Sequence, residues 1–149
     1  MKNDPARLLR ATYPYGVELA VRYGDLDTNN HMNNVAFGRF FEEGRVRLHR
    51  SLGGRGELEF RPIVANVSID YLREGSWPAP VIVAAGIVRF GNSSYVVGQA
   101  LFQEDACIAV SDTVMVNRAA AGPGGAPLSA KLRQVLEPLR LAASPKESG

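Results

Sequence analysis

One helical repeat set among strand-like patterns is the feature that most constrains how this chain folds. In residues 35–52, apolar side chains and one glycine recur every three or four positions, and arginines and glutamates fill the opposite face, which we expect to be solvated. This is the pattern of an amphipathic helix. The recurring positions are Phe37, Phe40, Phe41, Gly44, Leu48 and Leu52. We therefore expect one long helix here, capped by Asn33 or Asn34 and stopped by Gly53-Gly54.

Alternation of apolar and polar residues predicts one strand before the helix and four after it. These strands cover residues 17–23, 65–71, 81–90, 95–103 and 108–117. Residues 91–94 and Glu104-Asp105 are of turn-forming types, so they predict hairpins between the last three strands. The order predicts an α+β fold in which an antiparallel sheet of about five strands packs on the long helix.

The C-terminal part of the chain changes in composition. After Asn117 the sequence is rich in Ala, Gly and Pro and then carries an amphipathic stretch that contains Pro138. We expect the main domain to cover 15–118, and 119–149 to be a linker and a short C-terminal helix. One long helix covers only one face of such a sheet, so a second subunit is expected on the apolar remainder.

Bulk charge and length exclude several classes of protein. The 149 residues include 17 Lys and Arg and 15 Asp and Glu, a net charge of +2 that predicts no nucleic-acid or membrane partner. No apolar stretch has the ~20 residues of a membrane span, and residues 1–5 do not resemble a secretory signal. The single cysteine, Cys107, forms no internal disulfide. We expect a cytoplasmic protein.

The densest group of reactive side chains lies in residues 25–34, between the first strand and the helix. A calcium loop is disfavoured because Asn30 stands where glycine is needed and Ala36 stands where a bidentate glutamate is needed. A transition-metal site would use Asp27, His31 and His49, but the chain has few further ligands and no HExxH spacing. We therefore predict no metal ion.

Two interpretations of this loop stay open from its residues. Asp and Asn side chains commonly turn a chain and cap a helix, and they need no other role. The functional alternative depends on the Asp-x-Asn-x-His spacing of Asp27, Asn29 and His31 just before a helix. Free N–H groups at a helix N-terminus polarise a carbonyl oxygen, and a nearby carboxylate activates water or attacks.

Residues 22–43 resemble hotdog-fold thioesterases of the 4-hydroxybenzoyl-CoA thioesterase type, in which a catalytic carboxylate matching Asp27 precedes the long central helix. Residues 27–34 also resemble the loop of acyl-ACP thioesterases, whose Asp-x-Asn-x-His triplet falls on Asp27, Asn29 and His31. There are two departures. Asn30 and Asn34 stand where the 4-hydroxybenzoyl-CoA type usually has aromatic residues or glycine. Acyl-ACP thioesterases carry two fused hotdog units, whereas this chain has one.

The resemblance implies a hotdog domain that forms a homodimer or homotetramer and hydrolyses acyl-CoA, or acyl-ACP, to a free acid and a thiol, as in fatty acid metabolism. It implies no cofactor. Glu74 matches an acidic residue that assists catalysis, although Gly75 replaces the cysteine that usually follows. Backbone amides near Asn33 and Asn34 would hold the thioester carbonyl. The residues implied to bind substrate are Phe37, Phe41, Arg89, Gly91, Asn92, Ser93 and Ser94.

Two other functions remain possible for the same fold. One is a non-catalytic acyl-CoA binding module that keeps the pocket without turnover. The other is a hotdog hydratase or dehydratase, whose hydration motif we do not find in this sequence. Release of thiol from acyl-CoA separates hydrolysis from both.

Overall fold

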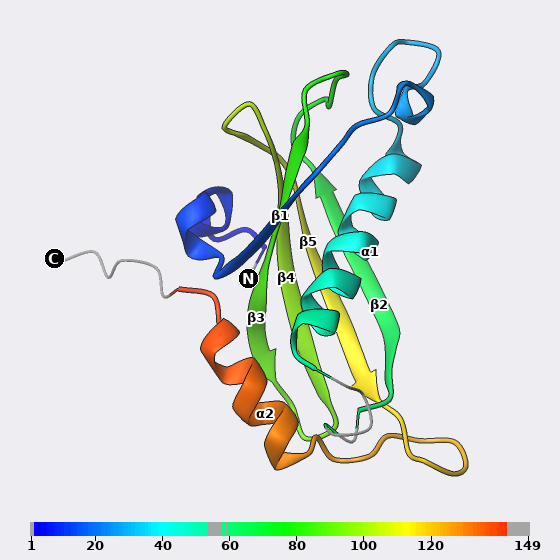
Figure 1. The fold of residues 1–149 in the computed structure, drawn as a ribbon, viewed down its shortest axis with the longest axis vertical. Helices are drawn as coiled ribbons and strands as arrows, with labels where there is room; N and C mark the ends of the chain where they lie inside the picture. The colour runs from blue at the N-terminus through cyan, green and yellow to red at the C-terminus, as the bar shows by residue number, and fades with distance from the viewer. Residues whose placement is uncertain (1, 54–57, 59, 143–149) are drawn as a thin grey trace, which may run out of the picture.

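A five-stranded antiparallel sheet and one long helix make up most of the computed structural model, which describes residues 2–53, 58 and 60–142. The strands are β1 (Tyr15–Leu19), β2 (Pro62–Tyr71), β3 (Val81–Phe90), β4 (Ser94–Gln103) and β5 (Ala106–Asn117), in the order β1-β3-β4-β5-β2. The helix α1 (Asn34–Ser51) runs across one face of the sheet (Figure 1). The short helix α2 (Ala130–Leu136) lies at the end of the sheet where α1 ends. The predicted α+β fold is confirmed.

The predicted long helix is confirmed to within one residue at each end. The Asn33 side chain accepts a hydrogen bond from the Ala36 N–H (2.8 Å) and so caps the N-terminus. The helix ends at Ser51, and Gly53 follows with φ of 110°, a conformation that favours glycine. The predicted stop at Gly54 lies outside the described residues.

Phe40, Phe41 and Leu48 on α1 are fully buried against the sheet. Gly44 lies on the same stripe because a Cβ there would come 2.5 Å from Val83 Cγ1 of β3. The absence of a side chain at position 44 therefore lets the helix and the sheet approach closely.

We expect Gly44→Ala to lower the free energy of unfolding by about 1–3 kcal/mol, because overpacking outweighs the gain in helix propensity. Gly38→Ala is the matched control on the same helix. A Cβ at Gly38 has no neighbour within 4 Å, so that change should stabilise the protein by about 0.5–1 kcal/mol. Urea unfolding measures both changes. Equal stabilisation by the two would show that the contact with Val83 does not limit helix packing.

The first predicted strand, 17–23, differs from the structure. β1 covers Tyr15–Leu19, and Tyr23–Asp25 forms a 3-10 turn instead. Val21 still points into the core with 6% exposure, but Tyr23, the last apolar position of the predicted strand, is 70% exposed, so the alternation indicates burial only as far as Val21. The chain leaves the sheet because the Asp25 carboxylate accepts a hydrogen bond from the Arg22 N–H (2.8 Å).

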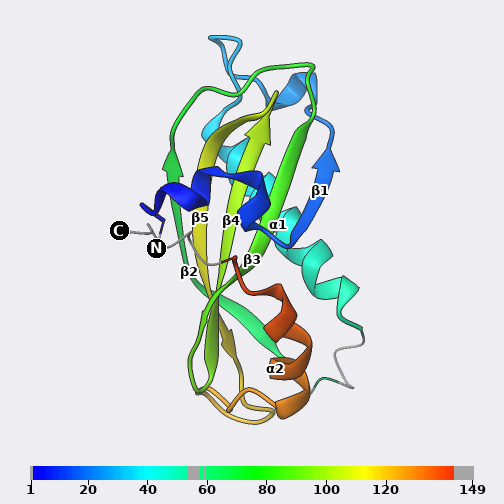
Figure 2. The same cartoon turned by 90° about the vertical axis from the view of Figure 1, so that its left-hand side faces the viewer.

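Apolar residues fill both faces of the sheet. Beneath α1, two clusters of buried side chains follow one another along the helix, and Leu132 and Leu136 of α2 belong to the second cluster. The opposite face is covered by the N-terminal segment with its short 3-10 helices, Pro5–Leu8 and Arg10–Thr12 (Figure 2). The division of the chain at residue 118 stays a prediction, and residues 143–149 lie outside the described part.

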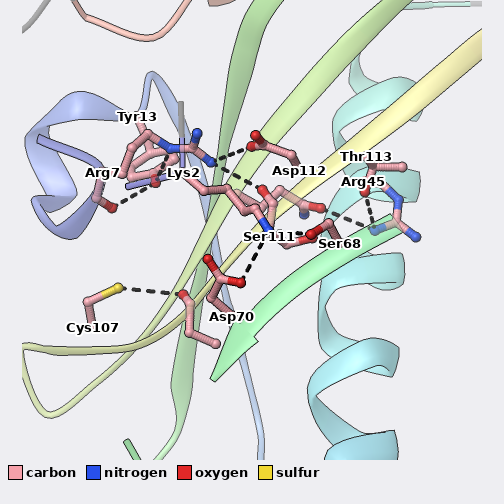
Figure 3. A network of polar contacts seen from close by, with 12 residues as sticks. Lys2, Arg7, Tyr13, Arg45, Ser68, Asp70, Cys107, Ser111, Asp112 and Thr113 are labelled. Atoms are coloured by element: carbon pink, nitrogen blue, oxygen red, sulfur yellow. Dashed lines mark hydrogen bonds and ion pairs between the residues drawn. The ribbon is translucent and has the colours of Figure 1, made fainter. Parts of the chain in front are cut away.

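The N-terminal segment is held to the sheet by a buried arginine (Figure 3). Arg7 is 2% exposed; it donates to the Tyr13 hydroxyl (3.0 Å), the Ser111 carbonyl (3.1 Å) and the Asp112 carboxylate (2.8 Å). Burial raises the pKa of Tyr13 to about 12, although Arg7 opposes the shift. The Tyr13 hydroxyl therefore stays protonated and uncharged at neutral pH. The positive charge of Arg7 is balanced by the Asp112 carboxylate.

Candidate active site

The loop before α1 is anchored by Asp25, which is 5% exposed. One carboxylate oxygen of Asp25 lies 2.6 Å from Arg39 Nη2 of α1, and the Asp25 carbonyl accepts from the Asn33 N–H (2.9 Å). Burial alone would raise the pKa of Asp25, but the Arg22 N–H and the Arg39 guanidinium outweigh it and hold the pKa below its usual value. Asp25 is therefore a structural carboxylate that ties the loop to the helix.

A carboxyl group whose pKa is lowered on folding adds stability above its ordinary pKa, and this contribution is lost as the pH falls through the lower, folded-state value. We expect Asp25→Asn to lower the free energy of unfolding at pH 7 by about 2 kcal/mol. The gap to the wild type should shrink below about pH 4. Urea unfolding across pH measures this, with the exposed Asp105→Asn as control. If the difference in unfolding free energy between Asp25→Asn and the wild type stayed unchanged down to about pH 2, the lowered pKa of Asp25 would be contradicted.

Asp27 is exposed and organises the turn that follows it. Its Oδ1 accepts hydrogen bonds from the N–H groups of Asn29 (2.9 Å) and His31 (3.2 Å), and its own N–H donates to the His31 carbonyl (2.8 Å). Asn30 sits in the left-handed region at φ 62°, which asparagine tolerates. Within the described residues Oδ2 of Asp27 makes no hydrogen bond. One oxygen therefore holds the turn and the other remains available for chemistry.

His31 meets Glu74, which follows β2 in the chain. His31 Nε2 lies 3.0 Å from Glu74 Oε2, with the two side chains 45% and 73% exposed. The loop reaches this strand end because the Met32 N–H donates to the Gly75 carbonyl (2.9 Å). A Cβ at position 75 would come 2.8 Å from Met32 Cε, so glycine at this position allows the close approach.

An open cleft of about 420 Å³ lies between this loop and the end of β2. It brings together several of the site residues predicted from the sequence: Asp27, Asn29, His31, Asn34, Phe37 and Glu74. Tyr71 and Arg73 also line the cleft and were not among them. The Tyr71 ring packs edge-on against Phe37 with centroids 5.2 Å apart. The only sequence signal for these two was their position just before Glu74, because strand alternation does not show which residues border a cleft.

The N-terminus of α1 opens on the same cleft through Asn34. The N–H of Asn33 donates to the Asp25 carbonyl, and the N–H of Ala36 is taken by the cap. Among the described residues the N–H groups of Asn34 and Val35 have no acceptor. In this geometry Asn34 and Val35, rather than Asn33, offer free backbone donors.

The remaining predicted substrate residues lie elsewhere. Phe41 is fully buried in the core beneath α1. Arg89 lies near the end of β3. Gly91, Asn92 and Ser93 form the β3–β4 turn and Ser94 begins β4, and the Gly91 N–H donates to the Ser94 carbonyl (2.7 Å). A ten-residue strand spans roughly 30 Å, so within one chain this turn is far from the cleft. Its contact with substrate stays a prediction.

No group of three or more His, Cys, Asp or Glu side chains suited to a metal ion occurs in the part of the chain that the structure describes. Of the helices in the described ranges, none is long and apolar enough to cross a membrane.

Comparison with known proteins identifies the family. Residues 21–138 match the model of the thioesterase-like superfamily. The PA5185 protein of Pseudomonas aeruginosa is 27% identical, with a TM-score of 0.75, over 92% of this chain and 99% of that one. A Thermus thermophilus thioesterase, solved with coenzyme A and Zn, is 28% identical, with a TM-score of 0.77, over 86% and 95%.

A thioesterase-superfamily protein of Jannaschia sp. is 26% identical, with a TM-score of 0.75, over 89% of this chain and 88% of that one. No curated protein matches the chain significantly in sequence. The predicted hotdog fold is confirmed by the topology together with these neighbours. With a family match that runs from residue 21, before the Asp27 loop, through α2, the chain belongs to the thioesterase-like superfamily.

Proposed function

We propose that this protein hydrolyses acyl-CoA thioesters in the cleft at Asp27, as a relative of the 4-hydroxybenzoyl-CoA thioesterase type with an acyl-ACP-thioesterase-like Asp-x-Asn-x-His loop. The observation that carries the proposal is the cleft lined by both Asp27, whose Oδ2 makes no hydrogen bond within the described residues, and Asn34, whose backbone N–H has no acceptor there. A carboxylate beside a polarised carbonyl is what acyl transfer requires. The coenzyme A complex of the Thermus thermophilus neighbour supports CoA as the carrier.

The geometry supports the following roles. The thioester carbonyl oxygen accepts hydrogen bonds from the N–H groups of Asn34 and Val35. These N–H groups stabilise the negative charge that develops on the oxygen in the transition state. Asp27 takes a proton from water as the hydroxyl adds to the carbonyl carbon, and the CoA thiolate leaves and is protonated. Alternatively, Asp27 attacks the carbon itself, the C–S bond breaks as the CoA thiolate leaves and is protonated, and water then hydrolyses the resulting anhydride to the free acid and the Asp27 carboxylate. The His31–Glu74 pair positions the reactants in either route.

Release of free thiol from a panel of acyl-CoA thioesters tests the proposal, with alkyl and aryl acyl groups and matched acyl-ACP substrates. We expect turnover on at least one acyl-CoA. Binding without thiol release would indicate an acyl-CoA binding module, and loss of an enoyl chromophore would indicate a hydratase. Either result would contradict hydrolysis.

We expect the chain to form at least a dimer, because β2 is a sheet edge whose single partner strand among the described residues is β5. Val64 and Val67 on this strand are 47% and 42% exposed, and an apolar edge strand favours pairing with a second chain. Sedimentation measures the mass. Val67→Glu should shift the assembly toward monomer, whereas Leu9→Glu in the N-terminal segment should leave the dimer intact. A stable, active wild-type species of 16.1 kDa would contradict this expectation.

A further inference from the structure

A groove of about 360 Å³ lies on the face of the sheet away from α1, between the N-terminal segment and the ends of three strands. Among the described residues it shares no lining residue with the Asp27 cleft. Its volume is at the lower end of the range of small-molecule sites. The lining side chains are apolar or acidic, with one arginine among them.

The floor of the groove follows from the register of the strands. Glu18 of β1 pairs with Ile82 of β3, and Ile82 pairs with Phe102 of β4, so these three residues form a row across the sheet. Val17 and Leu19, the neighbours of Glu18, pack in the core beneath α1. Because side chains alternate along a strand, the row faces the opposite side. The floor therefore places one carboxylate beside two apolar side chains.

The N-terminal segment adds an apolar wall that remains in contact with water. Leu8 and Leu9 line the groove and are exposed, and Ile82 on the floor is 37% exposed. Tyr13 of the same segment is, by contrast, buried against the sheet. Covering these exposed apolar side chains would remove apolar surface from water, so the groove favours a ligand with an apolar body.

The acidic side chains of the groove lack a balancing cation. Within the described residues, Glu18, Glu104 and Asp105 make no side-chain hydrogen bond and no ion pair. Arg10, the cation in the lining, donates to the Tyr13 carbonyl instead (3.0 Å). The lining carries three carboxylates against one guanidinium, and its field therefore favours a cation.

The charge of the groove also decides between possible occupants. A metal ion needs ligands that converge, and the described part of the chain has no group of three or more His, Cys, Asp or Glu side chains suited to one. A second copy of the chain docked here about a two-fold axis would bring the same carboxylates toward one another, and like charges across an interface are unfavourable. An organic cation meets neither obstacle.

We propose that this groove binds a small organic cation, a protonated amine whose apolar body lies on Ile82, Phe102 and the exposed leucines of the N-terminal segment. The ammonium group donates to the carboxylates that line the groove, and hydrogen bonds between charged groups are the strong ones. The apolar body covers the wall and floor. The site is separate from the Asp27 cleft, and its occupancy does not depend on thioester hydrolysis.

Calorimetric titration of the whole protein with hexylamine and phenethylamine at neutral pH tests the proposal, against hexanol, phenethyl alcohol and methylammonium. The wild type should bind at least one amine about tenfold or more tightly than its alcohol, because the alcohol carries no charge. Methylammonium should bind about tenfold or more weakly than that amine, because it has no apolar body. Equal binding of amine and alcohol, methylammonium as tight as the amine, or no saturation by millimolar amine would overturn the proposal.

Two double variants with the same net charge locate the ammonium group. Glu18→Gln/Glu104→Gln removes two carboxylates of the groove and should weaken amine binding about tenfold or more without changing alcohol binding. Glu43→Gln/Glu137→Gln removes two exposed carboxylates outside the groove, each paired with an arginine, and should change nothing. Amine binding that survives in a folded Glu18→Gln/Glu104→Gln protein, or that falls equally in the control, would overturn the proposal.

Two single variants separate the groove from the Asp27 cleft, which also contains carboxylates. Ile82→Thr keeps a β-branched residue on β3 and should weaken binding of the amine about threefold or more, because apolar surface is lost from the floor. Asp27→Asn should leave amine binding unchanged. An unchanged affinity in folded Ile82→Thr, or loss of amine binding with Asp27→Asn, would place the amine elsewhere and overturn the assignment.

Discussion

Replacing Asp27 by asparagine is expected to lower kcat on the best acyl-CoA substrate by about 10²–10⁴-fold, with KM little changed. The amide oxygen of asparagine can still accept from the N–H groups of Asn29 and His31, so the turn survives. What disappears is the basic, nucleophilic oxygen that has no hydrogen bond within the described residues. An effect on kcat alone is the signature of a group that acts in the transition state.

Steady-state kinetics of thiol release measure this effect, with the unfolding midpoint of each variant recorded alongside. Asp105→Asn, in the exposed β4–β5 turn, is the matched control and should leave kcat unchanged. His31→Ala should cost less than Asp27→Asn, because His31 positions groups. A folded Asp27→Asn protein with near-wild-type turnover would remove Asp27 from the mechanism.

Asp112→Ala is expected to lower the free energy of unfolding by about 3 kcal/mol, a roughly hundredfold shift in the folding equilibrium. Arg7 is 2% exposed, and its Nη1 already lacks a partner among the described residues. Without the Asp112 carboxylate, a buried cation keeps only the Tyr13 hydroxyl and the Ser111 carbonyl. Leaving one charge of a buried pair uncompensated is what makes the loss large.

Urea unfolding compares this variant with two others. The double variant Arg7→Leu/Asp112→Leu removes both charges and should recover most of the loss. Asp70→Ala removes a carboxylate that is 52% exposed and pairs with Lys2 at 3.2 Å, so it should change stability by less than about 0.5 kcal/mol. Equal effects from Asp112→Ala and Asp70→Ala would show that burial of the Arg7 pair is unimportant.

The spacing of apolar residues was sufficient to predict α1 and the existence of every strand. Burial of one face in the core requires apolar side chains to recur with the period of a helix or of a strand. It failed where a side chain decides the path of the backbone, as at the Arg22–Asp25 hydrogen bond that ends β1 early. For the site, the composition of the loop indicated Asp27, Asn29 and His31. The contact of His31 with Glu74 depends on how the end of β2 meets the loop, which no local pattern contains.

The charged face of α1 shows the same limit. Of the arginines expected to be solvated, Arg45 is buried beside Gly44, where the helix comes closest to the sheet. Arg39 binds Asp25 rather than Glu43, its i,i+4 neighbour, whereas Arg47 does pair with Glu43. Helical spacing shows which side chains can meet on one helix. It does not show which groups a neighbouring loop or strand brings to them.

The approach of Gly75 to Met32 has a consequence for divergence within the family. Because a Cβ at position 75 would meet the Met32 side chain at 2.8 Å, the two positions share one volume at the edge of the cleft. A larger residue at 75 requires a smaller one at 32, or a wider gap that would break the hydrogen bond from the Met32 N–H to the Gly75 carbonyl. Residues 32 and 75 should therefore covary among homologues that keep the Asp27 loop, although they lie on different segments.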